Sequence, residues 1–245
     1  EWPAKIAEVA LWLMDHQMNM RISEEFGQYF VRLPLNKKAS IVHGNALRID
    51  WEEVVPKTEL SYILGNPPFL GKKEQSKVQK AELLEVLSGI RGAGILDYVT
   101  GWYILSAQYI ADTTIRVAFV STNSIGQGEQ VGVLWGELFT HYQVKIHFAH
   151  TTFKWGNEAR GNAGVHVVII GFGVKDINKK EIYEYENAKG NPVLKSVQNI
   201  NPYLVEGPDL FIQNRKKPIC DVEEVIYGSF ALDDGNYTIS QTEYD

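Results

Sequence analysis

The chain has 245 residues, of which 44% are hydrophobic, and a formal net charge of −6 at pH 7. This composition supports a large domain with a core, and no apolar run reaches the length of a membrane span. The negative charge argues against a protein that coats nucleic acid non-specifically, because phosphate binding needs a positive face. A single cysteine, Cys220, excludes an internal disulfide, and with no signal-like opening segment it predicts a cytoplasmic location.

The first stretch predicts a helix followed by an irregular segment. Pro3 suits a first helical position, and apolar residues recur after it at helical spacing. These residues are Ile6, Val9, Ala10, Leu13 and Met14. We expect the helix to end near Asn19 and residues 20–39, which contain Pro34, to be irregular.

A short strand and a loop are predicted next. Ile41-Val42-His43 is a short apolar piece, and Gly44-Asn45-Ala46-Leu47 follows it as a loop. From the residues alone, Asn45 fits an ordinary turn as well as it fits a ligand-binding position.

The most informative stretch is Leu60–Phe69. Its apolar run is long enough for a buried strand and stops at Gly65, after which Asn66-Pro67-Pro68-Phe69 follows. Proline restricts its own backbone and that of the preceding residue, so the Asn66 amide and the Pro67 carbonyl are held in a stiff loop. In open α/β sheets, ligands bind at this end of a strand. Two acceptors and an aromatic ring suit a flat ligand with an exocyclic amino group, and we favour this function over a simple Asn-Pro turn.

Two helices are predicted after this motif. The first has Leu83, Leu84, Val86 and Leu87 on its apolar side, and the second runs from about Leu96 to Ala111 after Gly92-Ala93-Gly94. Asp97 opens the second helix, where a helix cap or first-turn acid is the expected role. Four lysines precede the first helix and form either a solvated face or a surface for a phosphate backbone. They are Lys72, Lys73, Lys77 and Lys80.

Another strand–loop–helix unit follows. Val117–Ser121 predicts a buried strand, Ser124–Gln130 a polar loop and Val133–Phe139 a helix. Gly126 and Gly128 give only a short Gly-x-Gly, so the dinucleotide fingerprint of a Rossmann dehydrogenase is absent.

Val144–Phe148 alternates and predicts a half-exposed strand. His141, His147 and His150 lie nearby in sequence, but alternation sends neighbouring side chains to opposite faces. Neither cysteine nor carboxylate occurs at ligand spacing, so no metal site is expected.

An aromatic segment and a long hydrophobic run complete this part of the chain. A glycine-rich loop separates Thr152–Trp155 from Val165–Phe172. The rings of Phe153 and Trp155 are equally consistent with a structural aromatic cluster and with ligand stacking. Beyond residue 175, alternating pieces such as Ile182–Tyr185 predict a β-ribbon and a linker, and the basic patch at 214–218 is expected to be a solvated loop.

The motif Asn66-Pro67-Pro68-Phe69 resembles the catalytic motif of S-adenosylmethionine-dependent amino-methyltransferases, above all the adenine-N6 DNA methyltransferases. Trp2–Gln17, Ile41–Trp51 and Thr151–Phe172 resemble the methyltransferase region of single-chain type II restriction–modification enzymes, the MmeI-like group. The similarity is good over residues 1 to about 175 and weak beyond.

The resemblance implies an α/β fold with a Rossmann-like class I methyltransferase sheet flanked by helices. Residues 1–175 would be the C-terminal part of the catalytic domain, and 176–245 a β-ribbon and linker leading towards a target-recognition domain. The N-terminal cofactor-binding strands are expected to come from an upstream segment of the same polypeptide. We therefore expect the 245-residue chain alone neither to bind S-adenosylmethionine tightly nor to fold stably.

The resemblance also implies roles for individual residues. The catalytic set is Asn66, Pro67, Pro68 and Phe69. The cofactor-binding set is Asn45, which would bond the adenine amino group of the methyl donor, with Ala46, Leu47, Asn66 and Asp97. Phe69 and Phe153 would stack on the target base, with Trp155 as a second candidate ring.

The implied reaction transfers a methyl group from S-adenosylmethionine to an adenine flipped out of double-stranded DNA. Asn66 and the Pro67 carbonyl would hold the two amino hydrogens, so that the rate comes from positioning and fixed dipoles. No nuclease constellation is apparent in these residues. Two alternatives remain: methylation of a protein glutamine or another amino group, and a non-catalytic scaffold that binds nucleic acid.

Overall fold

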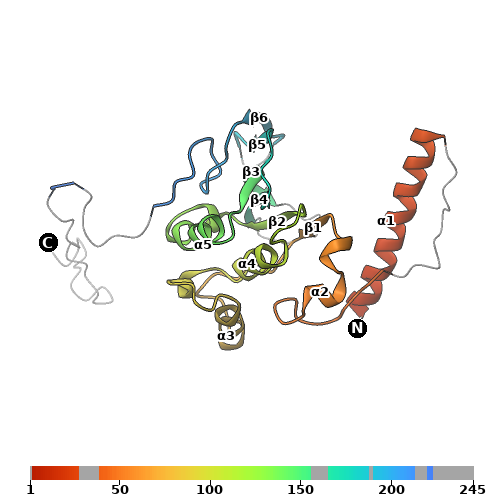
Figure 1. Cartoon of the computed structure of the whole chain (residues 1–245), viewed down its shortest axis with the longest axis horizontal. Coiled ribbons are helices and arrows are strands. Elements are labelled where there is room, and N and C mark those ends of the chain that lie inside the picture. The colour runs from red at the N-terminus through yellow and green to blue at the C-terminus, as the bar shows by residue number, and fades with distance from the viewer. Residues whose placement is uncertain (1, 28–38, 156–164, 188–189, 213–219, 223–245) are drawn as a thin grey trace, which may run out of the picture. The chain divides into compact units, whose positions relative to one another are not determined.

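The computed structural model describes residues 2–27, 39–155, 165–187, 190–212 and 220–222 (Figure 1). Residues Glu1–Gln213 form one compact unit and Asn214–Asp245 a second. The helices are α1 (Trp2–Phe26), α2 (Trp51–Val54), α3 (Lys77–Val86), α4 (Thr100–Tyr109) and α5 (Glu129–Thr140). Short 3-10 helices cover Lys57–Glu59, Ala93–Ile95 and Asn123–Gly126. The strands are β1 (Tyr62–Gly65), β2 (Arg116–Thr122), β3 (Lys145–Trp155), β4 (Val165–Gly173), β5 (Lys180–Glu184) and β6 (Val193–Val197).

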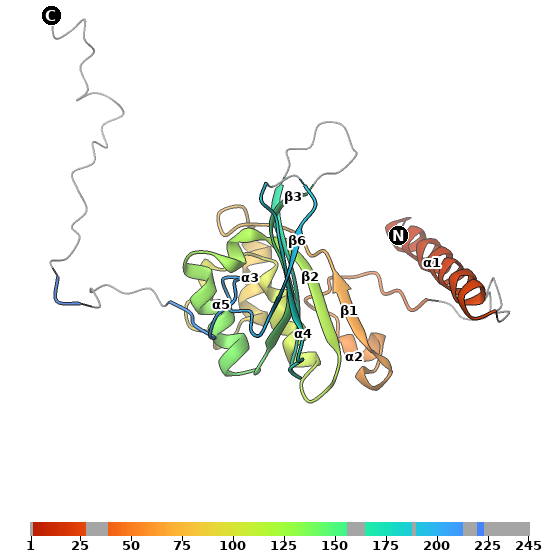
Figure 2. The same ribbon diagram turned by 90° about the horizontal axis from the view of Figure 1, so that it is seen from above.

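These strands form one mixed six-stranded sheet in the order β1-β2-β4-β3-β5-β6. The pairs β1–β2 and β3–β5 are parallel, and β4 runs antiparallel to both β2 and β3. β1, β2, β3 and β5 therefore run in the same direction, and their C-terminal ends meet at one edge, which we call the carboxyl edge (Figure 2).

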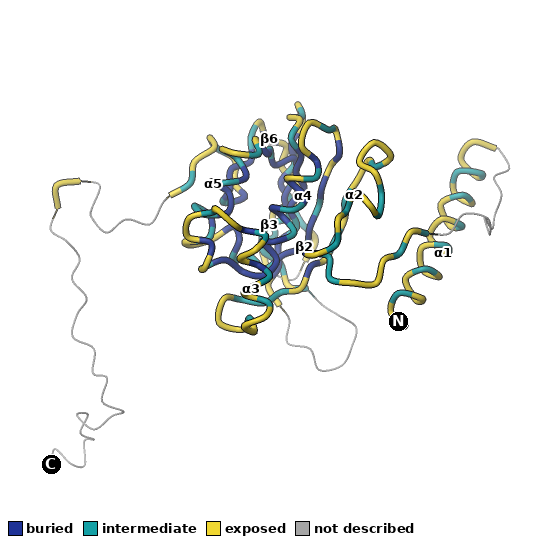
Figure 3. Tube along the Cα trace, turned by 60° about the horizontal axis from the view of Figure 1, so that its bottom comes forward, coloured by how far each residue is buried: buried dark blue, intermediate teal, exposed yellow. Residues whose placement is uncertain are grey.

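The core lies between the central strands and helices α4 and α5, and Figure 3 shows buried residues in dark blue along these elements. Tyr103 of α4 stacks on Phe172 of β4 with ring centroids 5.4 Å apart, and its edge contacts Phe119 of β2 at 5.3 Å. The Tyr103 hydroxyl lies 2.8 Å from Ser121 Oγ, so this buried polar group is satisfied. Every second residue of β2 is buried in this core, so the packing of the strand fixes the position of the residues at its C-terminal end.

The expectations for the centre of the chain are confirmed. A strand, a polar loop and a helix occur in the predicted order as β2, Asn123–Gly126 and α5, and the long hydrophobic run forms β4. The predicted β-ribbon is the antiparallel hairpin of β5 and β6. Because β5 pairs with β3, this hairpin continues the same sheet, and residue 175 falls between two of its strands.

Helix α1 is longer than predicted and ends at Phe26 rather than Asn19. The residues after Asn19 contain no glycine or proline until Gly27, whose φ of +63° terminates the helix. No α1 residue is buried. Pro34 and the rest of residues 28–38 lie outside the described residues, as do the glycine-rich loop at 156–164 and the basic patch at 214–218.

Two strand predictions near the N-terminus are wrong. Ile41-Val42-His43 forms no strand, because a strand needs a ladder partner and no described strand pairs with this short run. β1 is a strand but is not buried: Tyr62 is 61% exposed and Leu64 77%. The reason is that β1 pairs only with β2 and lies at the edge of the sheet in the described part of the chain.

β3 is longer and more buried than the predicted half-exposed strand. Ile146 and His147 are both buried, because an irregularity in the β3–β4 register between Ile146 and Phe148 interrupts the alternation. His147 Nε2 lies 2.8 Å from the Lys175 carbonyl oxygen, and burial lowers the pKa of His147.

Among the helices of the described residues, none has both the length and the apolar character that crossing a lipid bilayer requires.

Candidate functional site

Asn66-Pro67-Pro68-Phe69 directly follows β1, so the motif lies at the carboxyl edge as predicted. A Cβ atom on Gly65 would lie only 3.1 Å from the Phe119 ring, so glycine lets the end of β1 approach β2 closely. Pro67 is buried, whereas Asn66 is exposed, and its side chain hydrogen-bonds to no described residue. The Asn66 amide is therefore free to bind a ligand.

A cavity of about 740 Å³ opens beside this motif. Asn66, Pro67 and Pro68 line it together with Ala46 from the 44–47 loop. The rings of Trp51, Trp102 and Tyr109 form other parts of its wall. The structure thus brings three of the four predicted catalytic residues, Asn66, Pro67 and Pro68, and the predicted cofactor-binding residue Ala46 to a single, largely apolar cavity, which Phe69 does not line.

Residues 44–47 form a loop, as predicted, and the side chain of Asn45 closes a turn within it. Asn45 Oδ1 accepts a hydrogen bond from the Leu47 N–H at 3.0 Å, and the Asn45 carbonyl accepts one from the Arg48 N–H at 2.9 Å. Leu47 is buried against Gly101 of α4 and does not line the cavity. Ala46 faces the cavity, and its carbonyl accepts from the Trp51 indole N–H at 2.9 Å.

A polar cluster ties this loop to α3 and to the start of α4. The Tyr98 hydroxyl donates to Glu82 Oε2 at 2.9 Å, and Arg48 Nε donates to Glu82 Oε1 at 3.1 Å. Burial, aided by the bond to Glu82, raises the pKa of Tyr98 to about 12. The hydrogen bond from Tyr98, with smaller contributions from Asn45 and Arg48, lowers the pKa of Glu82. Glu82 is therefore an anion that fixes the loop carrying Ala46.

Asp97 is not a helix cap, which corrects the role expected from its position. Val99 is the N-cap residue of α4, and no side chain caps this helix. Asp97 Oδ2 instead accepts hydrogen bonds from Thr122 Oγ1 at 3.3 Å and from Ser124 Oγ. Both donors lie at the end of β2, so long-range packing rather than helix geometry determines where this carboxylate points.

Asp97 also lies next to the loop that follows Asn66-Pro67-Pro68-Phe69. The Tyr98 N–H donates to the Leu70 carbonyl at 2.9 Å. A Cβ atom on Gly71 would lie 3.7 Å from Asp97 Oδ1, an ordinary contact distance, so the backbone at Gly71 lies close to the carboxylate. Asp97 is only 6% exposed and forms no ion pair within the described residues. Its charge lacks a cationic partner in this part of the chain.

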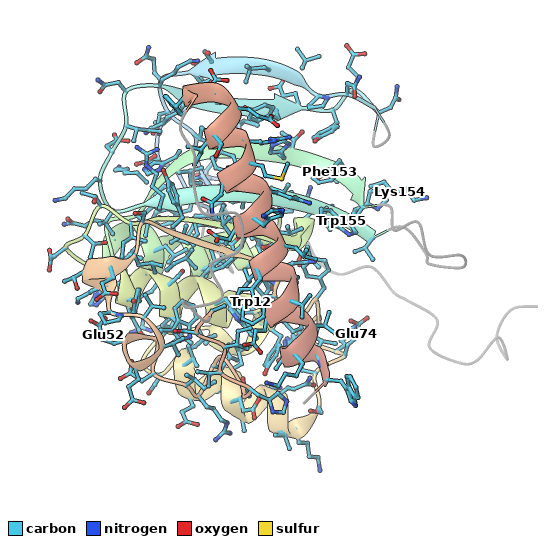
Figure 4. The ribbon with its side chains drawn as sticks, turned by 90° about the vertical axis from the view of Figure 1, so that its right-hand side faces the viewer. Trp12, Glu52, Glu74, Phe153, Lys154 and Trp155 are labelled. Carbon is cyan, nitrogen blue, oxygen red and sulfur yellow. The ribbon has the colours of Figure 1, made fainter. Side chains whose placement is uncertain are left out.

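Phe153 and Trp155 both lie in β3, with ring centroids 6.1 Å apart. Phe153 stacks on Tyr185 at 4.9 Å and 22°, and Tyr185 follows directly after β5. Figure 4 shows Phe153 and Trp155 at the end of β3, toward the same side of the molecule as Glu74 from the loop after β1. An aromatic cluster is therefore present, and its rings remain half-exposed.

The sequence reasoning missed two residues that position this site. Ser124 holds Asp97, and Tyr185 holds Phe153. The alternation at residues 182–185 was the only signal for Tyr185, and no sequence signal pointed to Ser124 because its partner is distant in the chain.

The exposure of the four lysines after the motif suits a solvated face and a surface for a phosphate backbone equally. Lys72, Lys73, Lys77 and Lys80 are all exposed. Within the described ranges, no three histidine, cysteine, aspartate or glutamate side chains gather closely enough to hold a metal ion.

Comparison with known proteins gives consistent results. The family model described as "MmeI, DNA-methyltransferase domain" matches residues 1–184. "DNA methyltransferase A" of Bacillus subtilis (strain 168) is 40% identical over 243 residues, which is 98% of this chain and 27% of that protein. The solved structure of the type IIL restriction–modification enzyme MmeI in complex with DNA is 51% identical with a TM-score of 0.86, and covers 99% of this chain and 32% of that one.

The chain thus spans about a third or less of the length of these relatives. The family model matches most of the chain, and the mixed sheet flanked by helices agrees with the MmeI structure. The predicted α/β methyltransferase fold is therefore confirmed, and the chain belongs to the MmeI DNA-methyltransferase domain family.

Proposed function

We propose that this domain methylates the N6 atom of adenine at specific sites in double-stranded DNA, with S-adenosylmethionine as methyl donor, within a restriction–modification polypeptide. The observation that carries the proposal is the Asn66 side chain, which is exposed, hydrogen-bonds to no described residue and lines the 740 Å³ cavity at the carboxyl edge. The names of the relatives support DNA as the substrate, since one is called a DNA methyltransferase and the other was solved with DNA.

The cavity beside Asn66 fits the methyl donor by its chemistry. Its aromatic walls and the small Ala46 side chain suit a purine ring. Asp97 does not line this cavity but lies close to Gly71 in the loop after the motif, and its buried carboxylate suits a positively charged group. S-adenosylmethionine, when bound, supplies a methyl group on a positively charged sulfur. The proposed cofactor-binding set remains Asn45, Ala46, Leu47, Asn66 and Asp97.

In the proposed reaction, the protein holds the amino group of the target adenine. Asn66 Oδ1 and the Pro67 carbonyl oxygen each accept one amino hydrogen, which favours a pyramidal nitrogen with its lone pair directed at the methyl carbon. Phe69 and Phe153 hold the flipped base by stacking. The rate comes from positioning and preorganised dipoles, because an aromatic amine needs orientation more than it needs a strong base.

The rest of the polypeptide completes the domain in this proposal. Residues 1–175 act as the C-terminal part of the catalytic domain, and 176–245 lead to a target-recognition domain. The free edge of β1, with Tyr62 and Leu64 exposed, is where strands from an upstream segment pair.

Asn66→Ala tests the proposal in the full natural polypeptide that carries this sequence. We expect methyl transfer to fall by a factor of about 100 or more, equivalent to roughly 3 kcal/mol, because an oriented acceptor acts mainly in the transition state. DNA binding, measured by fluorescence anisotropy, should change little. Near-normal turnover in the variant would contradict the mechanism, and transfer of labelled methyl to protein but not to duplex DNA would favour a protein substrate.

A further inference from the structure

A second, smaller cavity of about 300 Å³ lies at the carboxyl edge, and neither the sequence nor the proposed function assigns it a role. Asn123, which directly follows β2, contributes to its wall, as do Gln127 and Thr152. Thr152 lies in the irregular part of β3, where the register with β4 shifts between His150 and Phe153. Tyr185, Tyr203 and Leu204 also line it.

Residues that line this cavity contact or adjoin two parts of the proposed active site, the ring of Phe153 and the carboxylate of Asp97. Tyr185 is the ring on which Phe153 stacks, and Thr152 is the chain neighbour of Phe153. On the other side, Asn123 follows Thr122, which donates to Asp97. A ligand in the cavity would therefore lie next to the ring proposed to hold the target base.

The Tyr185 wall is held firmly. The His150 Nδ1 atom lies 2.9 Å from the Tyr185 hydroxyl oxygen, and Thr151 Oγ1 accepts a hydrogen bond from the Tyr185 N–H at 3.3 Å. The Thr151 hydroxyl in turn donates to the Tyr183 carbonyl at 3.2 Å. Such preorganisation lowers the entropy cost of stacking a ligand against a ring.

The chemistry of the lining selects a neutral ligand. All of the lining residues are uncharged, so a phosphate group placed there would lose its hydration without gaining a counter-charge. The side chains of Asn123, Gln127 and Thr152 hydrogen-bond to nothing else in the described residues. Three polar groups with unused hydrogen-bonding capacity and two tyrosine rings suit a flat, uncharged heterocycle.

We propose that this cavity is a second nucleobase subsite, which holds the base next to the target base on the same DNA strand. The proposal rests on the proposed function, because DNA is its source of bases. A volume of about 300 Å³ is at the lower end of the roughly 300–1,000 Å³ found for ligand pockets, which suits one base rather than a base pair. Asn123 and Gln127 carry amide groups that can pair with base edges, so the subsite contributes to sequence specificity.

The test combines a DNA change with a protein change. The methylated position is first mapped in DNA from cells that express the full polypeptide, and a duplex with this site is then made with an abasic analogue next to the target adenine. For the wild-type protein, removal of that base should weaken binding about tenfold, as expected for the loss of one stacked base. Asn123→Ala should bind the intact duplex about fivefold more weakly and the abasic duplex unchanged.

Asn178→Ala is the matched control, because Asn178 is exposed and does not line the cavity. It should keep the full tenfold effect of the abasic analogue. Asn123→Ala is not used alone if it melts at a lower temperature than the wild type. In that case Gln127→Ala, at an exposed position of the same wall, must also weaken binding of the intact duplex and leave binding of the abasic duplex unchanged.

Equal weakening of the intact and abasic duplexes by Asn123→Ala would overturn the subsite. If the effect of Asn123→Ala disappears when the base opposite the target is removed, and not when the neighbouring base is removed, the subsite holds a different base from the one proposed. If no methylated base is found in the mapped DNA, the proposed function fails and the subsite falls with it. If methylation occurs and only the coupling is missing, the proposed function stands without the subsite.

Discussion

At the scale of single residues, Asp97 presents a buried carboxylate with two hydroxyl donors on one oxygen and no cationic partner in the described residues. A buried charge is costly unless it is paired. The amino-acid end of S-adenosylmethionine carries an ammonium group that can donate hydrogen bonds to Asp97 Oδ1, whereas the sulfur cannot donate. We therefore expect Asp97 to hold that ammonium group.

Asp97→Asn should weaken binding of both S-adenosylmethionine and S-adenosylhomocysteine about tenfold, because the variant loses a hydrogen bond between charged groups. 5′-Methylthioadenosine lacks the amino-acid end, and its affinity should not change. Isothermal titration calorimetry on the full polypeptide measures all three. Equal weakening of all three ligands would mean that Asp97 only supports the fold.

Phe153 and Trp155 are the two candidates for the ring that would stack on a flipped base in the proposed reaction. Phe153 is fixed by Tyr185 and lies closer to the proposed second subsite, so we expect it to be the stacking ring. Phe153→Ala should weaken capture of the base by roughly 1–3 kcal/mol. The fluorescence of 2-aminopurine at the target position reports this loss, and Trp155→Ala serves as the control. A defect in the Trp155 variant alone would assign the role to the other ring.

The sequence predicted the position of the motif in the fold, because that position depends on neighbouring residues. Asn66 and Pro67 directly follow β1, and the apolar run that stops at Gly65 was enough to predict this position. The sequence could not predict that Asp97 bonds to Thr122 and Ser124, because these partners are 25 and 27 residues away. For the same reason, capping was expected at Asp97 and long-range packing decided otherwise.

At the scale of elements, side-chain hydrogen bonds in the first turn of α3 cap the start of this helix. Ser76 Oγ accepts from the Gln79 N–H at 3.2 Å, and Gln79 Oε1 accepts from the Ser76 N–H at 3.0 Å, which forms a capping box. Helix α3 carries Glu82, the anion that binds Arg48 and Tyr98. The cap therefore supports the loop on which Ala46 is placed.

Ser76→Ala should lower the free energy of unfolding by about 1 kcal/mol, because the Gln79 N–H in the first turn of α3 loses the Ser76 Oγ acceptor. The midpoint of urea denaturation, measured for the full polypeptide, reports the change. Ser88→Ala is the control, since Ser88 is exposed and lies after the end of α3. Equal effects of the two substitutions would show that the cap does not stabilise the helix.

Elements with a strong pattern were predicted well, and those that depend on neighbours were not. The hydrophobic runs of β2 and β4 and the helical spacing of α5 identified these elements from the sequence. A run such as Ile41–His43 has the composition of a strand but lacks a described partner, so it forms none. The parallel pairing of β5 with β3 joins segments far apart in the chain, and composition alone cannot reveal it.

At the scale of the whole molecule, β1 leaves one side of the sheet unpaired in the described residues, with Leu64 77% exposed. An open edge with exposed apolar side chains is a site for further strands. We expect the isolated 245-residue chain to show no cooperative melt and no micromolar binding of S-adenosylmethionine in calorimetry. The full polypeptide should show both. A cooperative melt and tight binding by the isolated chain would mean that the edge needs no partner strand.

The second cavity has no charge on any of its lining side chains, and this bears on how ionic strength affects DNA recognition. Contacts to phosphates weaken steeply as salt rises, because they depend on the release of counterions. Contacts from amides and rings to a base depend little on salt. Added salt should therefore lower the affinity of the protein for all DNA sequences by a similar factor. The ratio of affinities between duplexes that differ only in the base next to the target should stay nearly constant. A domain with a net charge of −6 would then keep its selectivity in concentrated salt, where its affinity is lowest.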